Sequence, residues 1–554
     1  MLLKSFPRTA AAIVFACFGA VSAFSSAQIT PHYYDNNGTT LGIGSAGSPG
    51  VWGETVGVGA VANWNISSAG GDPGLGLIAW PNFVDASAIF SGTGNVVRVD
   101  RVSTVLSAGI EVQSSGYLFR IPTTNARTFV GEWTLGLASG VNVTFDGRNA
   151  DGSTSTAGRT ITIDSVRHRT GAPGSSSVTL ETYSSGADVF RVNIANNGTF
   201  AVPLTITGTG AANIVGASTA IVDGSVTGNG SILHFGATSG NSLTINGAVS
   251  NGTGNVQFGV GGTGGGDGLV VLGNGAKTWQ NTIINLGANG IVRLNGANAL
   301  PTGTTVIFDS NSTLELNGLN RTIAGLSSGA ANGNVRNQSA VASTLTINGS
   351  GSTTFSGSIS NGVGGGALSL VRSGSGSTTL SGNNSYTGST TVSGGSLVID
   401  GTHTGGGAVS VTGGELKVNG SLTATTFNVS SPGTVSGNGS ITSAEINVSG
   451  TISPGSSIGS MAVNGNLNLN AGSTLEYELQ TNGLDGDLIH VVGGLNIANG
   501  TFLTVADLNA SIPVISGLKL TMISYTGSWN GGLLTLGATQ LANNDVFMVG
   551  GQEW

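Results

Sequence analysis

Enzymes that cleave polysaccharides need acidic side chains that meet in space, so the acidic residues are the first to consider. Such enzymes use paired Asp or Glu residues as acid, base or nucleophile. Between residues 291 and 500 the acidic residues are scattered: Asp309, Glu315, Asp400, Glu415, Glu445, Glu476, Glu478, Asp485 and Asp487. Glu315 and Glu415 each lie between apolar residues, so we expect both to face solvent. The spacing predicts no catalytic pair, and we expect no enzyme.

Metal-binding patterns are weak as well. Asp485 and Asp487 could offer carboxylate oxygens to Ca²⁺, but the further ligands of a calcium loop are lacking and a plain turn is the alternative. The segment GGTGGGDGLVV (261–271) misplaces Asp267 for a calcium-binding glycine-rich repeat, which favours a flexible turn. The histidines lack metal-site spacing. They are His32, His168, His234, His403 and His490. We therefore predict no metal and no cofactor.

Three tryptophans near the N-terminus are the remaining candidates for ligand binding. Trp52, Trp64 and Trp80 could form a platform on which sugar rings stack. Alternatively, they could close the open end of a repetitive β structure, where apolar faces would otherwise meet water.

The N-terminus has the features of a secretory signal. Lys4 and Arg8 precede an apolar stretch that is short for a membrane span. Cleavage could follow Ala23 or Ala27, of which we favour Ala27, and an uncleaved membrane anchor is the alternative. The single cysteine, Cys17, lies in this segment, so the mature chain has no disulfide or thiolate. No other apolar run is long enough to cross a membrane. We expect an exported protein, either secreted or at the cell surface, where outer-membrane association is one option.

The composition indicates an all-β protein. The chain has 554 residues, of which 95 are Gly and 12 are Pro, with 38% hydrophobic and 8% charged residues. Disordered chains combine low hydrophobicity with high charge, and collagen requires Gly at every third position; neither applies. After signal removal, 16 basic and 26 acidic residues give a net charge of −10, which disfavours nucleic acid as a partner.

A short pattern recurs along the chain: an apolar residue, any residue, an apolar residue, then Asn-Gly or Asp-Gly. Its alternation puts both apolar side chains on one face of a strand, and the Gly-containing pair supplies positive φ for a turn. Its copies begin at Leu243, Val292, Leu314, Leu345, Leu397 and Leu416.

The spacing of these strands separates two architectures. Val292 to Leu314 is 22 residues, and Leu397 to Leu416 is 19. Phe427 to Ile446 is another 19. Copies about 20 residues apart suit one coil of a right-handed parallel β-helix, in which stacked coils share a core. Antiparallel hairpins, the alternative, would space them at roughly 8–12 residues. Within SGNNSYTGSTTVSGGSLVIDG (381–401) and the preceding TTL, we expect Leu380, Val392, Leu397 and Ile399 to face inward. Ser and Thr should then face outward, in part as hydroxyl ladders.

Residues 368–401, LSLVRSGSGSTTLSGNNSYTGSTTVSGGSLVIDG, resemble the autotransporter-associated β-strand repeat of bacterial passenger proteins. The flanking sequence from 290 to 500 resembles the usual surroundings of that repeat. The resemblance implies a β-helix exported to the cell surface. It also implies a C-terminal membrane β-barrel, for which the 54 residues after 500 are too few, and a PEP-CTERM sorting tail is missing too. We therefore expect either that the chain is truncated or that its anchor was lost.

The expected organisation has five parts. Residues 1–27 are the signal, 28–120 an N-terminal β cap region and 121–290 irregular coils. Residues 291–500 form the regular β-helix, and 501–554 a terminal β segment. The expected function is structural: a passenger-like shaft that mediates adhesion through contacts with cell-surface or matrix components, glycans among them. A polysaccharide-degrading β-helix enzyme and a carbohydrate-binding module at the Trp-rich end are the alternatives.

Overall fold

The computed structural model describes most of the chain after residue 190. Side chains are described for residues 135–138, 141–145, 165–166, 175–183, 190–259, 268–480, 485–508 and 520–541. The other strands named below are described by their backbone alone. The predicted signal, residues 1–27, lies outside the described residues. Within the described part, no helix is long and apolar enough to cross a membrane.

The chain divides into two compact units. The first comprises residues 1–155 and 159–181, and the second comprises 156–158 and 182–554. In the first unit, the described strands pair in parallel except β1 with β3. These strands are β1 (Pro31–Tyr34), β2 (Gly50–Trp52), β3 (Trp64–Asn65), β4 (Ser87–Phe90), β5 (Val96–Val99), β6 (Gly109–Val112), β7 (Tyr117–Arg120), β8 (Thr128–Phe129), β9 (Thr134–Leu137), β10 (Asn142–Asp146), β11 (Arg159–Ile163), β12 (Ser165–His168) and β13 (Ser177–Thr182).

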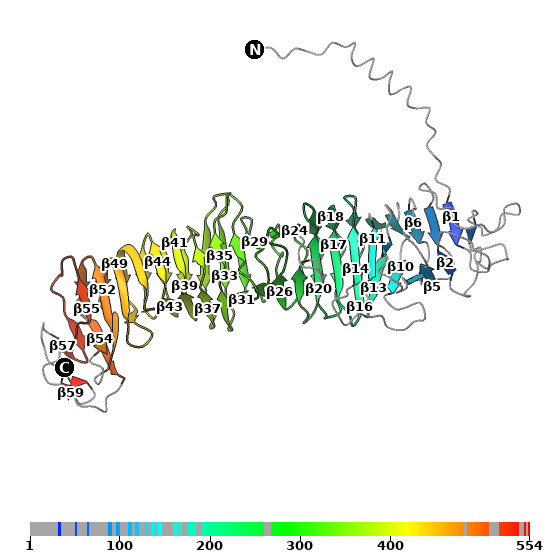
Figure 1. Ribbon diagram of the computed structural model, residues 1–554. Helices are drawn as coiled ribbons and strands as arrows, with labels where there is room; N and C mark the ends of the chain where they lie inside the picture. The colour runs from blue at the N-terminus through cyan, green and yellow to red at the C-terminus, as the bar shows by residue number, and fades with distance from the viewer. Residues whose placement is uncertain are drawn as a thin grey trace, which may run out of the picture. The chain divides into compact units, whose positions relative to one another are not determined.

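The second unit is a parallel β-solenoid, which confirms the predicted β-helix. Its strands stack one above another in columns (Figure 1). Column 1 contains β15 (Thr199–Phe200), β18 (Thr219–Val222), β21 (Ser242–Ile245), β24 (Leu269–Leu272), β27 (Ile291–Leu294), β29 (Thr313–Glu315), β32 (Asn334–Arg336), β35 (Ser358–Ser360), β38 (Asn383–Asn384), β41 (Thr402–Gly406) and β44 (Ser421–Ala424).

Column 2 is interrupted once, between β25 and β30. It contains β16 (Leu204–Gly208), β19 (Val226–Thr227), β22 (Val249–Ser250), β25 (Lys277–Thr278), β30 (Arg321–Ile323), β33 (Ser343–Ile347), β36 (Leu368–Arg372), β39 (Thr390–Val392), β42 (Val409–Val411) and β45 (Phe427–Val429).

Column 3 runs the length of the unit. It contains β14 (Phe190–Ile194), β17 (Ala212–Gly216), β20 (Leu233–Ala237), β23 (Val256–Phe258), β26 (Asn281–Ile284), β28 (Thr305–Phe308), β31 (Gly325–Ser328), β34 (Ser352–Phe355), β37 (Ser377–Leu380), β40 (Ser396–Ile399), β43 (Glu415–Val418), β46 (Thr434–Gly437), β48 (Thr451–Pro454), β50 (Thr474–Gln480), β54 (Thr501–Asp507) and β56 (Leu534–Leu536).

Longer strands replace columns 1 and 2 toward the C-terminus. β47 (Ser440–Val448) pairs with both β44 and β45, and β49 (Ser460–Leu469) follows it. The remaining strands are β51 (Asp485–Gly486), β52 (Leu488–Val492), β53 (Leu495–Ile497), β55 (Ile523–Tyr525), β57 (Thr539–Gln540), β58 (Met548–Val549) and β59 (Gln552–Glu553).

The dry centre follows from the alternation seen in the sequence. Leu380, Val392, Leu397 and Ile399 are fully buried, as predicted. Leu397 pairs in parallel with Leu416, and Phe427 with Ile446, so the 19-residue spacing is one coil. Each coil buries its inner face only by stacking on its neighbours, so a single coil would not be stable alone.

The Asn-Gly and Asp-Gly corners differ from the prediction. Among the six pairs, only Asn317-Gly318 has positive φ. The other glycines serve close approach between coils instead. A Cβ at Gly401 would overlap the carbonyl oxygen of Gly382, and one at Gly420 would overlap that of Gly401. The corner is therefore a stack of glycines, and the preceding side chains form rungs of their own: Asn419 donates to Asp400 at 2.8 Å.

Candidate functional site

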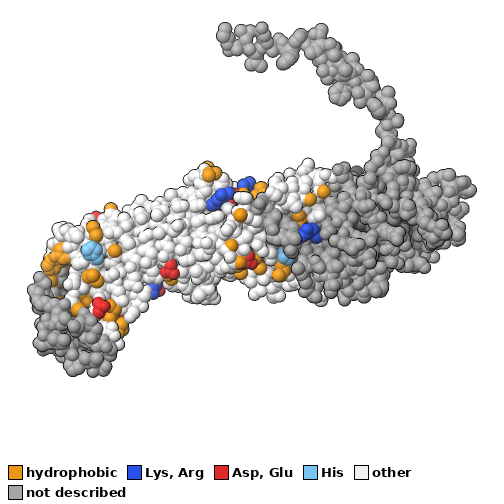
Figure 2. Space-filling view, in the orientation of Figure 1, with side chains coloured by type: hydrophobic (Ala, Val, Ile, Leu, Met, Phe, Trp, Pro, Cys, Tyr) orange, Lys and Arg blue, Asp and Glu red, His pale blue; other side chains and the backbone are white. Residues whose placement is uncertain are grey.

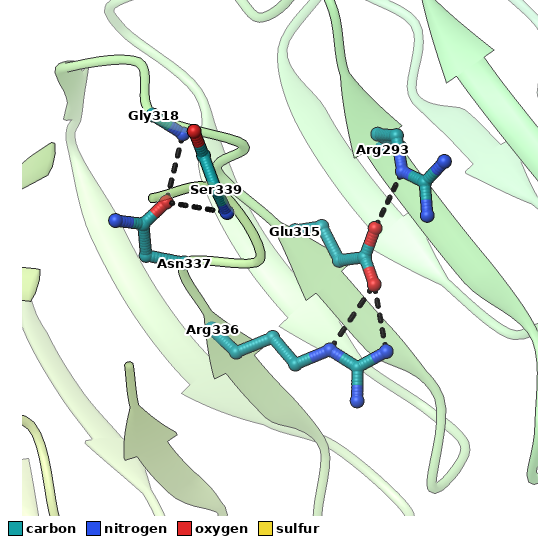
Figure 3. A network of polar contacts seen from close by, with 6 residues as sticks. All are labelled: Arg293, Glu315, Gly318, Arg336, Asn337 and Ser339. Atoms are coloured by element: carbon teal, nitrogen blue, oxygen red, sulfur yellow. Dashed lines mark hydrogen bonds and ion pairs between the residues drawn. The ribbon is translucent and has the colours of Figure 1, made fainter. Parts of the chain in front are cut away.

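An ion triad on the outer face of column 1 is the strongest candidate site. Arg293, Glu315 and Arg336 lie on β27, β29 and β32 and are partners in register across three successive coils. Arg293 Nε donates to one carboxylate oxygen of Glu315 at 2.6 Å. Arg336 donates to the other oxygen through Nε at 3.1 Å and Nη2 at 2.6 Å (Figure 3). The spacing of 22 and 21 residues is the coil period itself.

Burial within the triad is unequal. The side chain of Glu315 has no exposed surface, whereas Arg293 and Arg336 keep 35% and 31% of theirs. The prediction that Glu315 faces solvent is therefore wrong as to exposure. Its side chain is on the outer face, as the alternation requires, but the two arginines cover it. Two positive charges facing one negative charge leave a net charge of +1.

The guanidinium edges that do not bind Glu315 remain available. Within the described part of the chain, Nη1 and Nη2 of Arg293 and Nη1 of Arg336 make no hydrogen bond. Figure 2 shows how sparse charged side chains are on the face it draws. The triad is thus a fixed positive site on a surface made mostly of hydroxyl and amide groups.

The outer face of column 1 changes character on either side of the triad. Val271 precedes Arg293 in register, and Leu269 and Ile291 lie beside them; all three are half-buried. On the other side, Asn334 and Ser358 are hydrogen-bonded to each other at 2.6 Å. An apolar stretch, two arginines and a polar stretch therefore follow one another along the column.

Asn337 fixes the loop next to Arg336. Its buried side chain accepts hydrogen bonds from the backbone N–H of Gly318 at 2.7 Å and Ser339 at 3.3 Å (Figure 3). Its amide donates to the carbonyls of Val341 at 2.7 Å and Gly366 at 3.0 Å. One side chain thus ties three coils together and holds a loop on which Val341 is 64% exposed.

Three cations point inward, and none has an acidic partner among its described contacts. Lys277 Nζ donates to the carbonyl oxygens of Gly247 at 2.8 Å and Gly275 at 2.6 Å. Arg321 donates to Gly296, and Arg372 donates to Ile347 and Gly349, both at 2.9 Å. Gly247, Gly296 and Gly349 all belong to Asn-Gly corners of the preceding coils. Burial lowers the pKa of Lys277 to about 8 and lowers that of both arginines. These residues support corners and are not exposed to a ligand.

The segment around Tyr386 contributes a second buried polar cluster. Tyr386 is fully buried, and its hydroxyl lies 2.8 Å from Thr390 Oγ1. Its ring stacks on His403 from the next coil, with centroids 4.2 Å apart. Burial raises the pKa of Tyr386 and lowers that of His403, which keeps both side chains neutral near pH 7. The cluster therefore packs the interior.

The other acidic residues considered for catalysis or metal binding have varied surroundings. Glu415 accepts hydrogen bonds from Ser396 at 3.2 Å and Ser436 at 2.5 Å, on neighbouring coils. Glu445 accepts from Asn466 and Asn468, which lowers its pKa. Asp487 is fully buried and accepts from the backbone N–H of Gly459 and Glu478. Burial raises the pKa of Asp487 to about 6, although these two donors oppose the shift.

The side chains of the three tryptophans predicted to bind glycans lie outside the described part of the structure. Of Trp52 and Trp64 only the backbone is described, in β2 and β3, and Trp80 lies outside the described residues. Their role in glycan stacking or end closure stays a prediction. Among the residues that the structure describes, no three His, Cys, Asp or Glu side chains are grouped so that they could hold a metal ion.

Sequence reasoning missed both the triad and the inward cations, although each has a signal. Arg293 and Arg336 lie one coil period before and after Glu315. Arg372 follows Leu368 and Leu370 at period two, and Arg321 precedes Ile323 in the same way, so both share the inward phase.

One known family matches part of the second unit. Residues 370–399 match the passenger-associated-transport-repeat. The match coincides with the segment, 368–401, whose sequence resembles the passenger repeat, and confirms that resemblance. The chain thus carries a repeat of the autotransporter passenger type, built into a β-solenoid. No curated protein matches the chain.

Proposed function

We propose that this chain is an exported passenger-type protein whose solenoid is a shaft that mediates contacts at the cell surface. One observation carries the proposal: the passenger repeat is stacked in register with the coils on both sides of it. Leu370 pairs with Leu345 of the preceding coil, and Leu397 pairs with Leu416 of the following one. Within the repeat, β36 stacks on β39 and β37 stacks on β40, so the repeat spans parts of two successive coils. Because it also has neighbours on both sides, it is part of the shaft and not an isolated insertion.

The outer faces of the coils are polar and their side chains are hydrogen-bonded to one another, which suits a protein that is exposed to water and to other macromolecules. An asparagine ladder runs across four strands of the C-terminal half. Asn447 donates to Asn428 at 3.0 Å, and Asn468 donates to Asn447 at 2.8 Å. Asn496 continues the ladder to Asn468 at 2.7 Å. Such ladders satisfy polar groups within the outer face, so coils can be repeated without adding charge. They support a structural role for the shaft.

Protease access on intact cells tests the export proposal. The full chain, with an epitope tag inserted after Val363, is produced in the native host, because Val363 is 89% exposed in the loop between β35 and β36. We expect protease added to intact cells to cleave the tagged chain, or the tagged chain to be recovered from the medium. A matched chain lacking residues 1–27 should stay inside the cell and be protected. Full protection of the complete chain in intact cells, with none in the medium, would contradict the proposal.

Adhesion is tested separately with the purified chain. We expect beads coated with the solenoid to be retained on host-cell or matrix-coated surfaces above beads coated with an unrelated β-rich protein. Equal retention of the two would remove adhesion from the proposal while leaving export intact.

A further inference from the structure

We propose that Arg293 and Arg336 form a binding site for an acidic polysaccharide that lies along the outer face of column 1. This inference rests on the proposed function, because such a polymer meets the chain only after export. The proposed function gives the shaft general contacts at the cell surface. This site would give it a specific ligand class and two contact residues.

The free guanidinium edges supply the attraction. Glu315 neutralises one of the two positive charges, so an anion meets a net charge of +1. Arginine pairs with carboxylate and sulfate oxygens through two parallel N–H donors. Arg293 binds Glu315 through Nε alone, which leaves both of its terminal nitrogens for such a pair.

The buried carboxylate also fixes the geometry in advance. Each arginine is held by bonds of 2.6 Å to a side chain that has no exposed surface. A long side chain that is already ordered loses less conformational entropy when a ligand binds. By contrast, Lys417 on β43 has no ion pair within the described part of the chain, and its side chain is not preordered in this way.

The spacing favours a polymer with intermittent charge. Neighbouring strands lie about 4.8 Å apart, so two coils separate Arg293 and Arg336 by roughly 10 Å. Negative groups at about that interval along an extended chain would meet both arginines in turn. The half-buried Leu269, Val271 and Ile291 offer an apolar surface for sugar rings, and Asn334 offers an amide for hydroxyl groups.

Nucleic acid fits this site less well. Its backbone carries a charge at every nucleotide, so binding requires many basic residues to offset them. The chain has 18 basic and 26 acidic residues, a net charge of −8, which repels a continuous polyanion. A single +1 site suits a polymer whose charges are spaced.

Binding of defined polymers to the purified chain tests the proposal. The probes are hyaluronan, whose carboxylates fall on alternate sugars, and keratan sulfate, whose sulfates fall mainly on alternate sugars. They distinguish carboxylate from sulfate at the expected spacing, and neutral dextran and double-stranded DNA are the comparisons. The variant is Arg293→Gln, after which Glu315 keeps both bonds from Arg336. The matched control is Lys417→Gln, which removes one positive charge from column 3. Circular dichroism checks the fold of each variant.

We expect one or both acidic polysaccharides to bind and neutral dextran not to bind. Arg293→Gln should weaken the binding at least about tenfold, as expected for the loss of one charge-assisted pair, while Lys417→Gln should change it less than about twofold. Absence of binding, equal losses in the two variants, or DNA binding that depends equally on Arg293 would overturn the assignment. Because the measurement uses purified chain, its failure leaves the export result unaffected.

Discussion

The ring of Tyr386 stacks on the ring of His403 from the next coil, with centroids 4.2 Å apart and planes 26° from parallel. Tyr386 lies inside the passenger repeat, and His403 follows it by almost one coil. The contact joins two coils inside a core that consists mainly of aliphatic and phenylalanine side chains. A neutral imidazole is compatible with this position, but a charged one is not, because protonation would place a charge in the dry centre.

The first prediction concerns acid sensitivity. Burial lowers the pKa of His403 below its ordinary value of 6.5, and a weaker effect of the Asn384 backbone opposes this. The unfolded chain therefore binds the proton more readily than the folded one. This part of the stability is complete above pH 6.5 and is lost as the pH falls below it. In His403→Leu, unfolding by guanidinium should show a smaller loss of stability between pH 7 and pH 5 than in the wild type.

Leu is a suitable replacement because Leu422 occupies the next position of the same row. The exposed His490 offers a control, and His490→Gln should keep the wild-type pH dependence. His234, whose pKa burial lowers to about 4, remains in all variants and adds the same background. An unchanged pH dependence in His403→Leu would show that His403 is not the group responsible.

The second prediction concerns the buried cations. Arg372→Ala removes two donors from the carbonyls of Ile347 and Gly349 and leaves a cavity. We expect a loss of about 3 kcal/mol in local stability. Hydrogen exchange should show it as faster exchange of the β33 and β36 amides. The comparison is Lys417→Ala on an outer face, which should change stability by less than about 0.5 kcal/mol. Similar exchange rates in the two variants would argue against a structural role for Arg372.

The third prediction concerns the corner glycines. Gly401→Ala places a methyl group against the carbonyl oxygen of Gly382, so the coils must move apart. We expect the free energy of unfolding to fall by more than about 3 kcal/mol, because the contacting atom belongs to the backbone and cannot move aside as the end of a side chain can. At Gly351 a methyl group meets open space, and Gly351→Ala should be neutral or stabilising by up to about 1 kcal/mol. Chemical denaturation of the two variants makes the comparison. Equal stabilities would mean that the coils are not packed as closely as described.

Much of the solenoid could be predicted from the sequence. The alternation of Leu397 and Ile399 around one outward residue gave the inner face, and spacings of 19 to 22 residues gave the coil. The glycine stack could not be recognised, because Asn-Gly also marks turns with positive φ. Only the position of a carbonyl group on the preceding coil shows why Gly401 must lack a side chain.

The candidate site was harder to predict, because burial of a charged residue depends on its neighbours in other coils. Alternation placed Glu315 on the outer face correctly. It could not show that Arg293 and Arg336 cover it, because contacts between coils are not visible in one strand. Applying the coil period to charged residues would have predicted that Arg293, Glu315 and Arg336 are neighbours. Applying the strand alternation to them would have predicted that Arg372 faces inward.

The most direct test of the parallel stack is a set of distances along column 3. Spin labels are placed at Thr354 and, in turn, at Ser453, Glu476 or Thr504, in a chain with Cys17 replaced by Ala. All four positions face outward in column 3, and Ser453, Glu476 and Thr504 lie five, six and seven coils after Thr354. At about 4.8 Å per coil, the label separations should be roughly 24, 29 and 34 Å by electron paramagnetic resonance. Distances that fail to increase steadily with each coil would contradict the solenoid, and with it the account of the passenger repeat.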